Sequence, residues 1–146
     1  MARLRGEFHL ITGRPFVRGT IAIPRLRTLL NTVFLVDTGA DVSVLNPADA
    51  LALGIQDSAL THSVDVGGVT GRSQYRREPA TFSFQTPGRA HLYRLRVLVA
   101  PPTMDLVELP SLLGRDVLNR WHMSYRPTEG RLTFDIVTAD EEVRLK

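Results

Sequence analysis

The sequence predicts a single, mostly β domain over residues 1–146, with its core at about 16–136 and with one or two short helices. Short apolar or alternating segments, which are typical of strands, recur along the whole chain. Turns rich in glycine and proline separate them, and only two segments carry the signals of a helix. The length of 146 residues is that of one domain, and no internal repeat or linker interrupts it.

The first half of the chain predicts three strands. Residues 16–23 alternate weakly between apolar and polar side chains, and a proline ends this segment. Residues 31–36 form a nearly continuous apolar run, which is typical of a buried strand. Residues 42–45 predict a further short strand. The turn between these last two segments contains two carboxylates, which a folding argument alone would not place there because an unpaired charge is costly to bury.

A short helix is expected to follow the third strand. Asn46 is a good N-cap residue, and Pro47 suits the first helical position. Asp49 would favour the positive end of the helix dipole. Gly54 can end the helix from the position after its last residue, where a left-handed conformation is common.

Two hairpins are predicted next. Residues 62–76 read HSVDVGGVTGRSQYR, so that two alternating arms flank a glycine-rich centre with Gly67, Gly68 and Gly71. An ordinary flexible hairpin tip is the alternative to a functional role for these glycines. Residues 80–85 and 91–100 would pair across the turn Thr-Pro-Gly-Arg.

The last third of the chain begins with a loop at residues 101–110, which has prolines at both ends. Residues 111–121 predict a short apolar strand that leads into a helix. Residues 122–136 predict a hairpin that turns at Arg-Pro-Thr-Glu-Gly-Arg. The tail at 137–146 is expected to be frayed, and the termini in general to be flexible or to form a dimer contact.

Composition argues against several classes of function. The chain has no cysteine, which removes disulfides, thiolate nucleophiles and cysteine-bound zinc. Its net charge of +3 comes from scattered arginines without a docking motif, so we expect no nucleic-acid partner. No apolar run approaches a membrane span, and the amino terminus lacks the apolar core of a signal peptide. We therefore expect a soluble, cytoplasmic protein without a membrane partner.

No cofactor or metal is expected either. The histidines do not have metal-ligand spacing, and packing or surface roles suit them better. Ser43 has no Gly-x-Ser-x-Gly context, so no serine triad is indicated. Asp135 lacks a Thr-Gly context and is expected to be a polar position on an outer strand. The histidines are His9, His62, His91 and His122.

The segment VFLVDTGADVSVL, residues 33–45, contains the chemistry that the sequence offers. Gly39 permits a tight turn close to another chain, and the Thr38 hydroxyl can both donate and accept a hydrogen bond. Two carboxylates held together share one proton, so that one can activate water while the other polarises a peptide carbonyl. Asp37 is the candidate for such a pair. The alternative is a turn aspartate that binds only local backbone amides.

The segment resembles the active-site segment of the retropepsin-like aspartic proteases, and the chain is similar to a bacterial or cellular member. The second motif of that family, two apolar residues followed by Gly-Arg-Asp and a short helix, is matched by SLLGRDVLNRW at residues 111–121. A glycine-rich hairpin between the two motifs is present as VGGVTG. The resemblance spans about residues 16–136 and implies the closed, barrel-like acid-protease fold with a flap hairpin.

The resemblance also implies a role for each matching residue. Asp37 would be the catalytic aspartate, Thr38 would reach the partner's turn, and Gly39 would offer its carbonyl to substrate. Asp41 would form a bidentate pair with Arg115 that tolerates burial. Substrate contacts are implied for Ala40, Asp41, Gly67, Gly68, Val69, Thr70 and Gly71, and structural support for Leu112, Leu113, Gly114, Arg115 and Asp116.

A single Asp-Thr-Gly in 146 residues implies that an active site needs two copies of the chain. The sequence therefore predicts a homodimeric aspartic endopeptidase that acts on protein or peptide substrates. The final hairpin, residues 122–136, is the candidate for the dimer contact. A catalytically silent module of the same fold, which binds peptides or dimerises, is the alternative.

Overall fold

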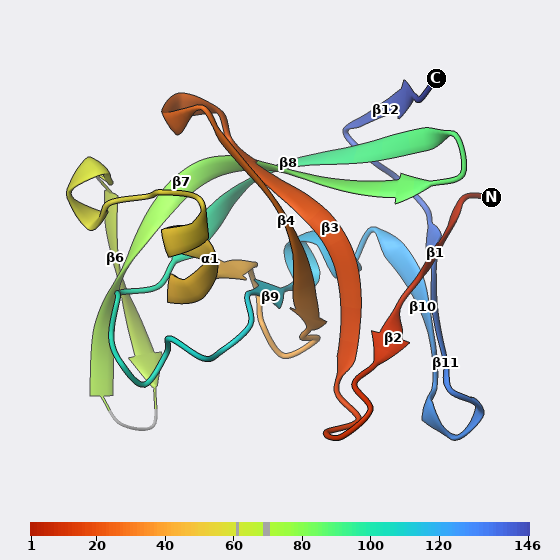
Figure 1. The fold of residues 1–146 in the computed structure, drawn as a ribbon, viewed down its shortest axis with the longest axis horizontal. Helices are drawn as coiled ribbons and strands as arrows, with labels where there is room; N and C mark the ends of the chain where they lie inside the picture. The colour runs from red at the N-terminus through yellow and green to blue at the C-terminus, as the bar shows by residue number, and fades with distance from the viewer. Residues whose placement is uncertain (61, 69–70) are drawn as a thin grey trace.

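Strands make up most of the computed structural model, which describes residues 1–60, 62–68 and 71–146 (Figure 1). The mostly β fold class is confirmed, and the α-helices are short. The strands are β1 Arg3–Arg5, β2 Glu7–Phe8, β3 Pro15–Ile23, β4 Thr28–Val36, β5 Val44–Leu45, β6 His62–Gly68, β7 Gly71–Thr86, β8 Arg89–Val99, β9 Leu112–Leu113, β10 Trp121–Arg126, β11 Arg131–Ile136 and β12 Glu141–Arg144. The α-helices are α1 Pro47–Ala52 and α2 Arg115–Leu118, and single 3₁₀ turns occur at Pro24–Leu26, Asp57–Ala59 and Pro127–Glu129.

Six strands close into a barrel in the order β8, β5, β9, β4, β3, β7, and β7 pairs back with β8. Most neighbours are antiparallel, but β4 pairs in parallel with β9, and β5 pairs in parallel with β8. Parallel pairs need a long connection, and here each one brings together segments far apart in the sequence. The residues that follow β4 and the residues that follow β9 therefore meet at one end of the barrel, where the Arg115 amide donates to the Ala40 carbonyl.

A second sheet of three antiparallel strands, in the order β1, β11, β10, packs beside the barrel. Aromatic side chains join the two. The ring of Trp121 lies 4.8 Å from that of Phe84 in the barrel and 5.2 Å from that of Phe134 in the small sheet. The Trp121 indole N–H also donates to the Tyr93 hydroxyl at 2.7 Å. Buried aromatic pairs of this kind contribute beyond the area they bury.

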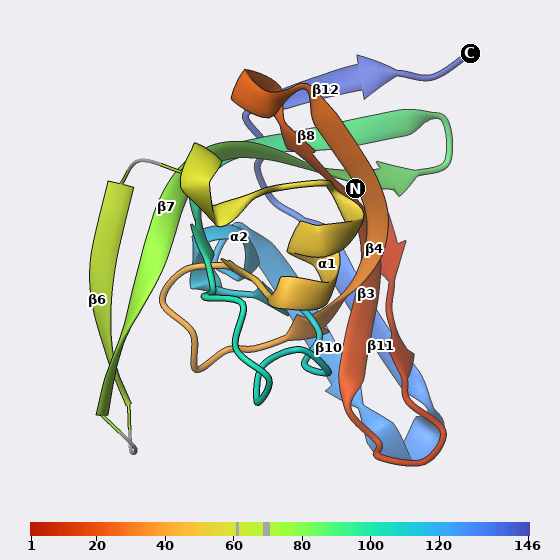
Figure 2. The same ribbon diagram turned by 60° about the vertical axis from the view of Figure 1, so that its left-hand side comes forward.

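The long hairpin predicted over residues 62–76 is confirmed. Strands β6 and β7 pair from His62 opposite Arg77 to Gly68 opposite Gly71. Figures 1 and 2 show this hairpin projecting from the rest of the molecule. Val69 and Thr70, which the sequence assigns to its tip, lie outside the described residues.

The strand predicted at 42–45 is shorter than expected. Only Val44 and Leu45 pair as β5, because the Ser43 amide instead donates to the Asp116 carboxylate at 2.9 Å. Helix α1 follows as predicted, and Gly54 beyond its end has a φ of +73°. Asn46 stands at the N-cap position, but its side chain makes no capping hydrogen bond. None of the helices in the described ranges is long and apolar enough to cross a membrane.

The prediction of a frayed tail is wrong for Glu141–Arg144, because these residues form β12 and pair with β8. Ion pairs hold the strand: Glu141 contacts Arg94 at 2.8 Å, and Glu142 contacts Arg89 at 3.1 Å. On β8, these arginines lie on either side of Leu92 and His91, the residues that pair with Glu141 and Glu142. The amino terminus is paired too, since β1 lies against β11.

Candidate active site

Asp37 is positioned by the parallel pair of β4 and β9. The Leu35 amide donates to the Ser111 carbonyl at 2.9 Å, and the Asp37 amide donates to the Leu113 carbonyl at 3.0 Å. These two bonds continue the strand pairing to the last residue before the turn. The Asp37 backbone is therefore fixed by a segment that follows much later in the sequence.

The turn itself is built around the Asp37 side chain. Its Oδ1 accepts the Gly39 amide at 3.0 Å, and its backbone carbonyl accepts the Ala40 amide at 3.2 Å. A Cβ on residue 39 would lie 3.3 Å from that same Oδ1, so glycine leaves room for the carboxylate. Asp37 is half-buried, whereas Thr38 and Gly39 are exposed. The carboxylate thus sits at the end of a fixed strand with one oxygen in use locally.

Arg115 ties the turn to the second motif. One guanidinium nitrogen donates to the Thr38 carbonyl at 2.9 Å, and the other contacts Asp41. The structure therefore places Arg115 beside Asp41, but the expectation of a buried, bidentate pair is wrong. The Asp41 side chain is 84% exposed and that of Arg115 is 42% exposed. Asp41 is a surface charge at the end of the turn, so the cost of burying a charge does not arise at this residue.

Beneath the turn lies a hydrogen-bond network that the sequence analysis missed. Ser43 is fully buried, and its hydroxyl donates to Asp116 Oδ1 at 2.7 Å while accepting the Gly114 amide at 3.0 Å. Asp116 Oδ2 accepts the Ser43 amide. The available signal was a small polar residue at an inward position, next to the inward Leu45, which calls for a buried partner.

Gly114 is confined by the same turn. A Cβ at this position would lie 2.6 Å from the backbone carbonyl group of Val42 and 2.9 Å from the Ala40 carbonyl oxygen. Such contacts are not tolerated by fixed backbone atoms, so only glycine fits. The glycine of the second motif therefore has a packing reason, and the Arg115 amide next to it donates to the Ala40 carbonyl at 2.9 Å.

Of the hairpin residues predicted to contact substrate, the structure describes Gly67, Gly68 and Gly71. Figures 1 and 2 show strands β6 and β7 and the turn after β4 as separate ribbons in both views. Gly67, Gly68 and Gly71 belong to these strands.

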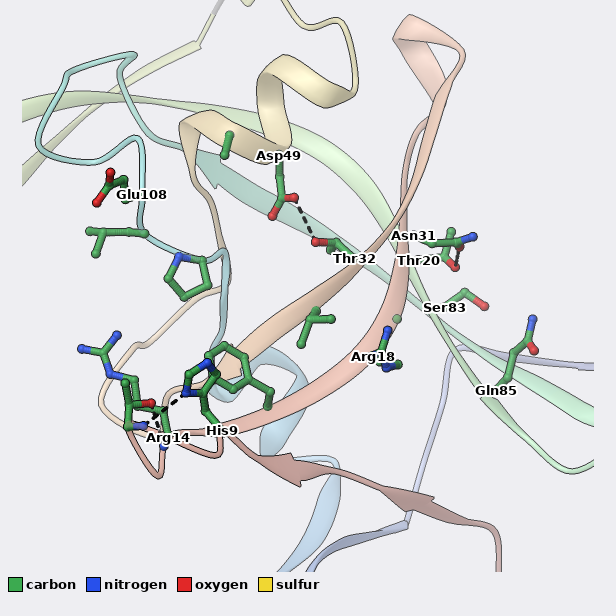
Figure 3. A pocket seen from close by; sticks show the side chains of 17 residues that line it. His9, Arg14, Arg18, Thr20, Asn31, Thr32, Asp49, Ser83, Gln85 and Glu108 are labelled. Carbon is green, nitrogen blue, oxygen red and sulfur yellow. Dashed lines mark hydrogen bonds between the residues drawn. The ribbon is translucent and has the colours of Figure 1, made fainter.

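A groove of about 920 Å³ lies elsewhere, on the outer face of β3 and β4 (Figure 3). Its walls come from these strands, from α1 and from residues 108–110. None of the described residues predicted for the active site lines it. The groove does include Asp49, which faces Thr32 in Figure 3.

The site offers one carboxylate for acid–base chemistry. Asp41 is paired with Arg115 and Asp116 with Ser43, so Asp37 is the acid of this loop with the least compensation. No described group of three His, Asp or Glu side chains is arranged to hold a metal ion. Alone, a carboxylate on an exposed turn can accept a proton but cannot also supply one, and peptide hydrolysis needs both.

Comparison with known proteins places the fold. Residues 30–120 match the family described as gag-polyprotein putative aspartyl protease. A retropepsin-like aspartic protease from Rickettsia conorii superimposes with a TM-score of 0.59 at 18% identity, covering 90% of this chain and 89% of that one. The EIAV protease, solved with the inhibitor HBY-793, gives 0.53 at 26% identity, covering 76% of this chain and 90% of that one. No curated protein matches the chain.

Proposed function

The chain belongs to this family of retropepsin-like aspartic proteases, and from that premise we propose that it is an aspartic endopeptidase. Two copies of the chain would form the active enzyme, with one Asp37 from each beside the two-fold axis. The observation that supports this most is the state of Asp37 itself: it is held by backbone on a fixed strand end, and its side chain has one local partner, the Gly39 amide.

The proposed reaction uses the two carboxylates in different protonation states. The ionised Asp37 takes a proton from a water molecule, whose oxygen adds to the peptide carbonyl carbon. The protonated Asp37 of the other copy donates a hydrogen bond to the carbonyl oxygen and stabilises the charge that develops there. The Asp37 that took the proton from water then gives it to the amide nitrogen as the C–N bond breaks, so that the pair again holds one proton. Since the pair must hold one proton, activity should be highest at acidic to near-neutral pH.

Thr38, Gly39 and the β6–β7 hairpin take the supporting roles in the proposal. Exposed Thr38 would contact the partner's turn, and the exposed Gly39 carbonyl would bind substrate backbone. The hairpin would close over an extended peptide, which adds as a strand through main-chain hydrogen bonds. Ala40, Asp41, Gly67, Gly68, Val69, Thr70 and Gly71 are the proposed contacts.

We propose that the second copy covers the end of the molecule at which Asp37 lies. Leu10 and Ile11, in the turn between β2 and β3, are almost completely exposed. Strand β10 is an edge of its sheet, and its Met123 and Tyr125 are 40% and 49% exposed. Figures 1 and 2 show that turn and the β10–β11 hairpin at the same end as the turn after β4, whereas both chain termini lie away from it.

Such a surface favours a partner chain for two reasons. Exposed apolar side chains on a turn are stabilised when they are removed from water. An open strand edge offers unpaired backbone groups that a second copy can match. A two-fold axis at this end would also bring the two Asp37 carboxylates together, which neither terminus could do from its own position.

The test combines cleavage with mass in solution. The wild-type chain should be a dimer and should cleave unstructured peptide libraries, whereas Asp37→Asn should remain a dimer and lose cleavage. Glu141→Gln, an acid at the far end of the molecule, serves as the matched control and should cleave normally. Equal cleavage by Asp37→Asn would contradict the proposal. A dimer that binds peptides but never cleaves them, at any pH, would favour the silent binding module instead.

The dimer surface has its own control. Leu10→Ser with Ile11→Ser should shift the chain toward monomer and lower its specific activity at low protein concentration. Leu29→Ser removes another exposed leucine, at the start of β4, and should leave the mass unchanged. If both variants behave alike in sedimentation, the turn between β2 and β3 is not part of the interface.

A further inference from the structure

The residues at the start of α1 bind a distant loop instead of their own helix. The Asn46 side-chain amide donates to the Pro110 carbonyl at 2.6 Å, and no side chain caps the helix. The Asn46 backbone amide donates to the Ser111 hydroxyl at 3.0 Å. Asn46 and Ser111 are both buried. Asparagine usually caps a helix through its side chain, but here the side chain of Asn46 makes a tertiary contact. This departure from the local preference points to a function for that contact.

Asp49 completes this contact. Its Oδ2 accepts the Ser111 hydroxyl at 2.6 Å, and its Oδ1 accepts the Thr32 hydroxyl of β4 at 2.9 Å. Figure 3 shows the Asp49 carboxylate directed at Thr32. Hydrogen bonds to an ionised group are about twice as strong as neutral ones. Asn46 and Asp49 thus hold the same serine from both sides, one as donor and the other as acceptor.

The serine stands where residues 101–110 join β9. This loop contains no strand or α-helix, and its carbonyl–amide bonds are local ones, such as Leu106 to Thr103 and Leu109 to Leu106, each at 3.1 Å. At its start, the Ala100 amide donates to the Leu45 carbonyl at 2.9 Å. At its other end, Asn46 and Asp49, together with the Leu35 amide, hold the residues that lead into β9.

The loop borders the turn that carries Asp37. The next residue, Ser111, has the carbonyl that accepts the Leu35 amide, and β9 then runs beside β4 up to Asp37. Figures 1 and 2 show the loop beside the turn after β4. Its apolar side chains Met104 and Val107 are exposed, whereas exposed Leu109 lines the groove on the outer face of β3 and β4. A peptide lying over Asp37 would place its side chains against such a wall.

We propose that Asn46 and Asp49 are positioning residues that set residues 101–110 relative to Asp37 and thereby determine which apolar side chains the cleft accepts. The inference rests on the proposed protease function. The clamp acts on substrate side chains through the loop and does not touch the reacting atoms. Its loss should therefore appear in KM and in side-chain preference, with kcat nearly unchanged.

The experiment uses Asp49→Asn, which keeps the shape but can accept only one of the two hydroxyl hydrogen bonds, and Ser111→Ala. Kinetics on peptides that differ in the apolar residues around the scissile bond should show KM raised about tenfold for the preferred peptide and a flatter preference. The double variant should add little to either single one, because both remove the same contact. Asp140→Asn is the matched control, since it loses carboxylate hydrogen bonds far from the loop and should leave KM and preference unchanged.

A second measurement does not depend on catalysis. An added glutamate-specific protease should cut the native chain after exposed Glu108 faster in Asp49→Asn than in the wild type or in Asp140→Asn, with the cut located by mass spectrometry. If the wild type cleaves peptides and Asp49→Asn has the same KM, preference and nicking rate, the clamp is refuted while the protease function stands. If the wild type cleaves nothing, the protease function fails, and the nicking rate alone decides whether Asp49 holds the loop.

Discussion

The turn after β4 and the strand β12 use their acidic side chains in opposite ways. In β12 and the residue before it, Asp140, Glu141 and Glu142 each have an arginine partner. In the turn after β4 and the helix beneath it, Asp41 and Asp116 are also partnered, but among the described residues the Asp37 side chain has only the Gly39 backbone amide. Every acid in these two regions that builds structure is matched within the chain. The unmatched acid is the one that the proposed reaction needs.

The largest effect is expected from breaking the turn region at Gly114→Ala. The new methyl group would lie 2.6 Å from the Val42 carbonyl group, which is backbone and cannot move aside freely. We expect a loss of about 3 kcal/mol or more in the free energy of unfolding, together with loss of activity. Urea unfolding measures it, and Gly130→Ala in the β10–β11 turn is a comparison at an open glycine whose cost comes only from its positive φ. An unfolding midpoint equal to wild type would show that the turn relaxes.

Ser43→Ala should have the next largest effect. The substitution removes the hydroxyl that joins Asp116 to the Gly114 amide and leaves that buried amide without its acceptor. We expect a loss of about 2 kcal/mol in unfolding free energy. Ser43→Thr keeps the hydroxyl and should recover part of it. If the Ser43→Ala and Ser43→Thr proteins are equally stable, the hydroxyl network under Asp37 contributes nothing to stability beyond packing.

The β12 side of the comparison is tested by pH. The Arg94 amide and then Arg120 lower the pKa of Asp140 below its usual value of 3.8. A lowered pKa in the folded state contributes stability that is present above the unfolded pKa and is lost as pH falls through the folded pKa. Asp140→Asn should therefore cost about 1 kcal/mol at pH 7, because these contacts are partly exposed, and the cost should shrink below about pH 4. A cost that is the same at pH 7 and at pH 2.5 would rule out this ionisation as its source.

Asp41→Asn should have the smallest effect on stability. Because the Asp41 side chain is 84% exposed, water screens its pair with Arg115 and the expected loss is about 0.5 kcal/mol or less. Thermal unfolding at low and high salt measures it. A loss as large as that of Ser43→Ala would mean that Asp41 belongs with the buried structural acids.

The sequence predicted the local elements better than it predicted the partners of side chains. The bounds of α1 follow from Pro47 and Gly54, because a proline at the first helical position and a left-handed glycine after the end act through neighbouring residues. The hydrogen bond from the Asn46 side chain to the Pro110 carbonyl could not be predicted, because that acceptor is brought in by the tertiary fold. Strand β12 was missed for the same reason, since its pairing depends on arginines about fifty residues earlier on β8.

For the site, the resemblance placed Arg115 next to Asp41 but gave the wrong environment. A motif indicates which residues lie next to each other. The exposure of their side chains depends on which other segments of the fold cover them. Alternation places Ser43 on the same face as Leu45, but its partners could not be read from the local sequence. Asp116 and the Gly114 amide lie more than seventy positions later and are brought in by the tertiary fold.

The parallel pairing of β4 with β9 also has a consequence for how the protein is made. Asp37 gets its backbone partner from Leu113, and the contact between Arg115 and Thr38 spans 77 positions. Contacts of such high sequence separation form late and slowly, because the entropy cost of closing a long loop comes before the contact can stabilise the fold. A ribosome-bound chain that has exposed only its first hundred residues contains Asp37 but lacks Leu113 and Arg115, which bind the turn. The partners of the turn that carries Asp37 are in place only after residues 111–115 have left the ribosome.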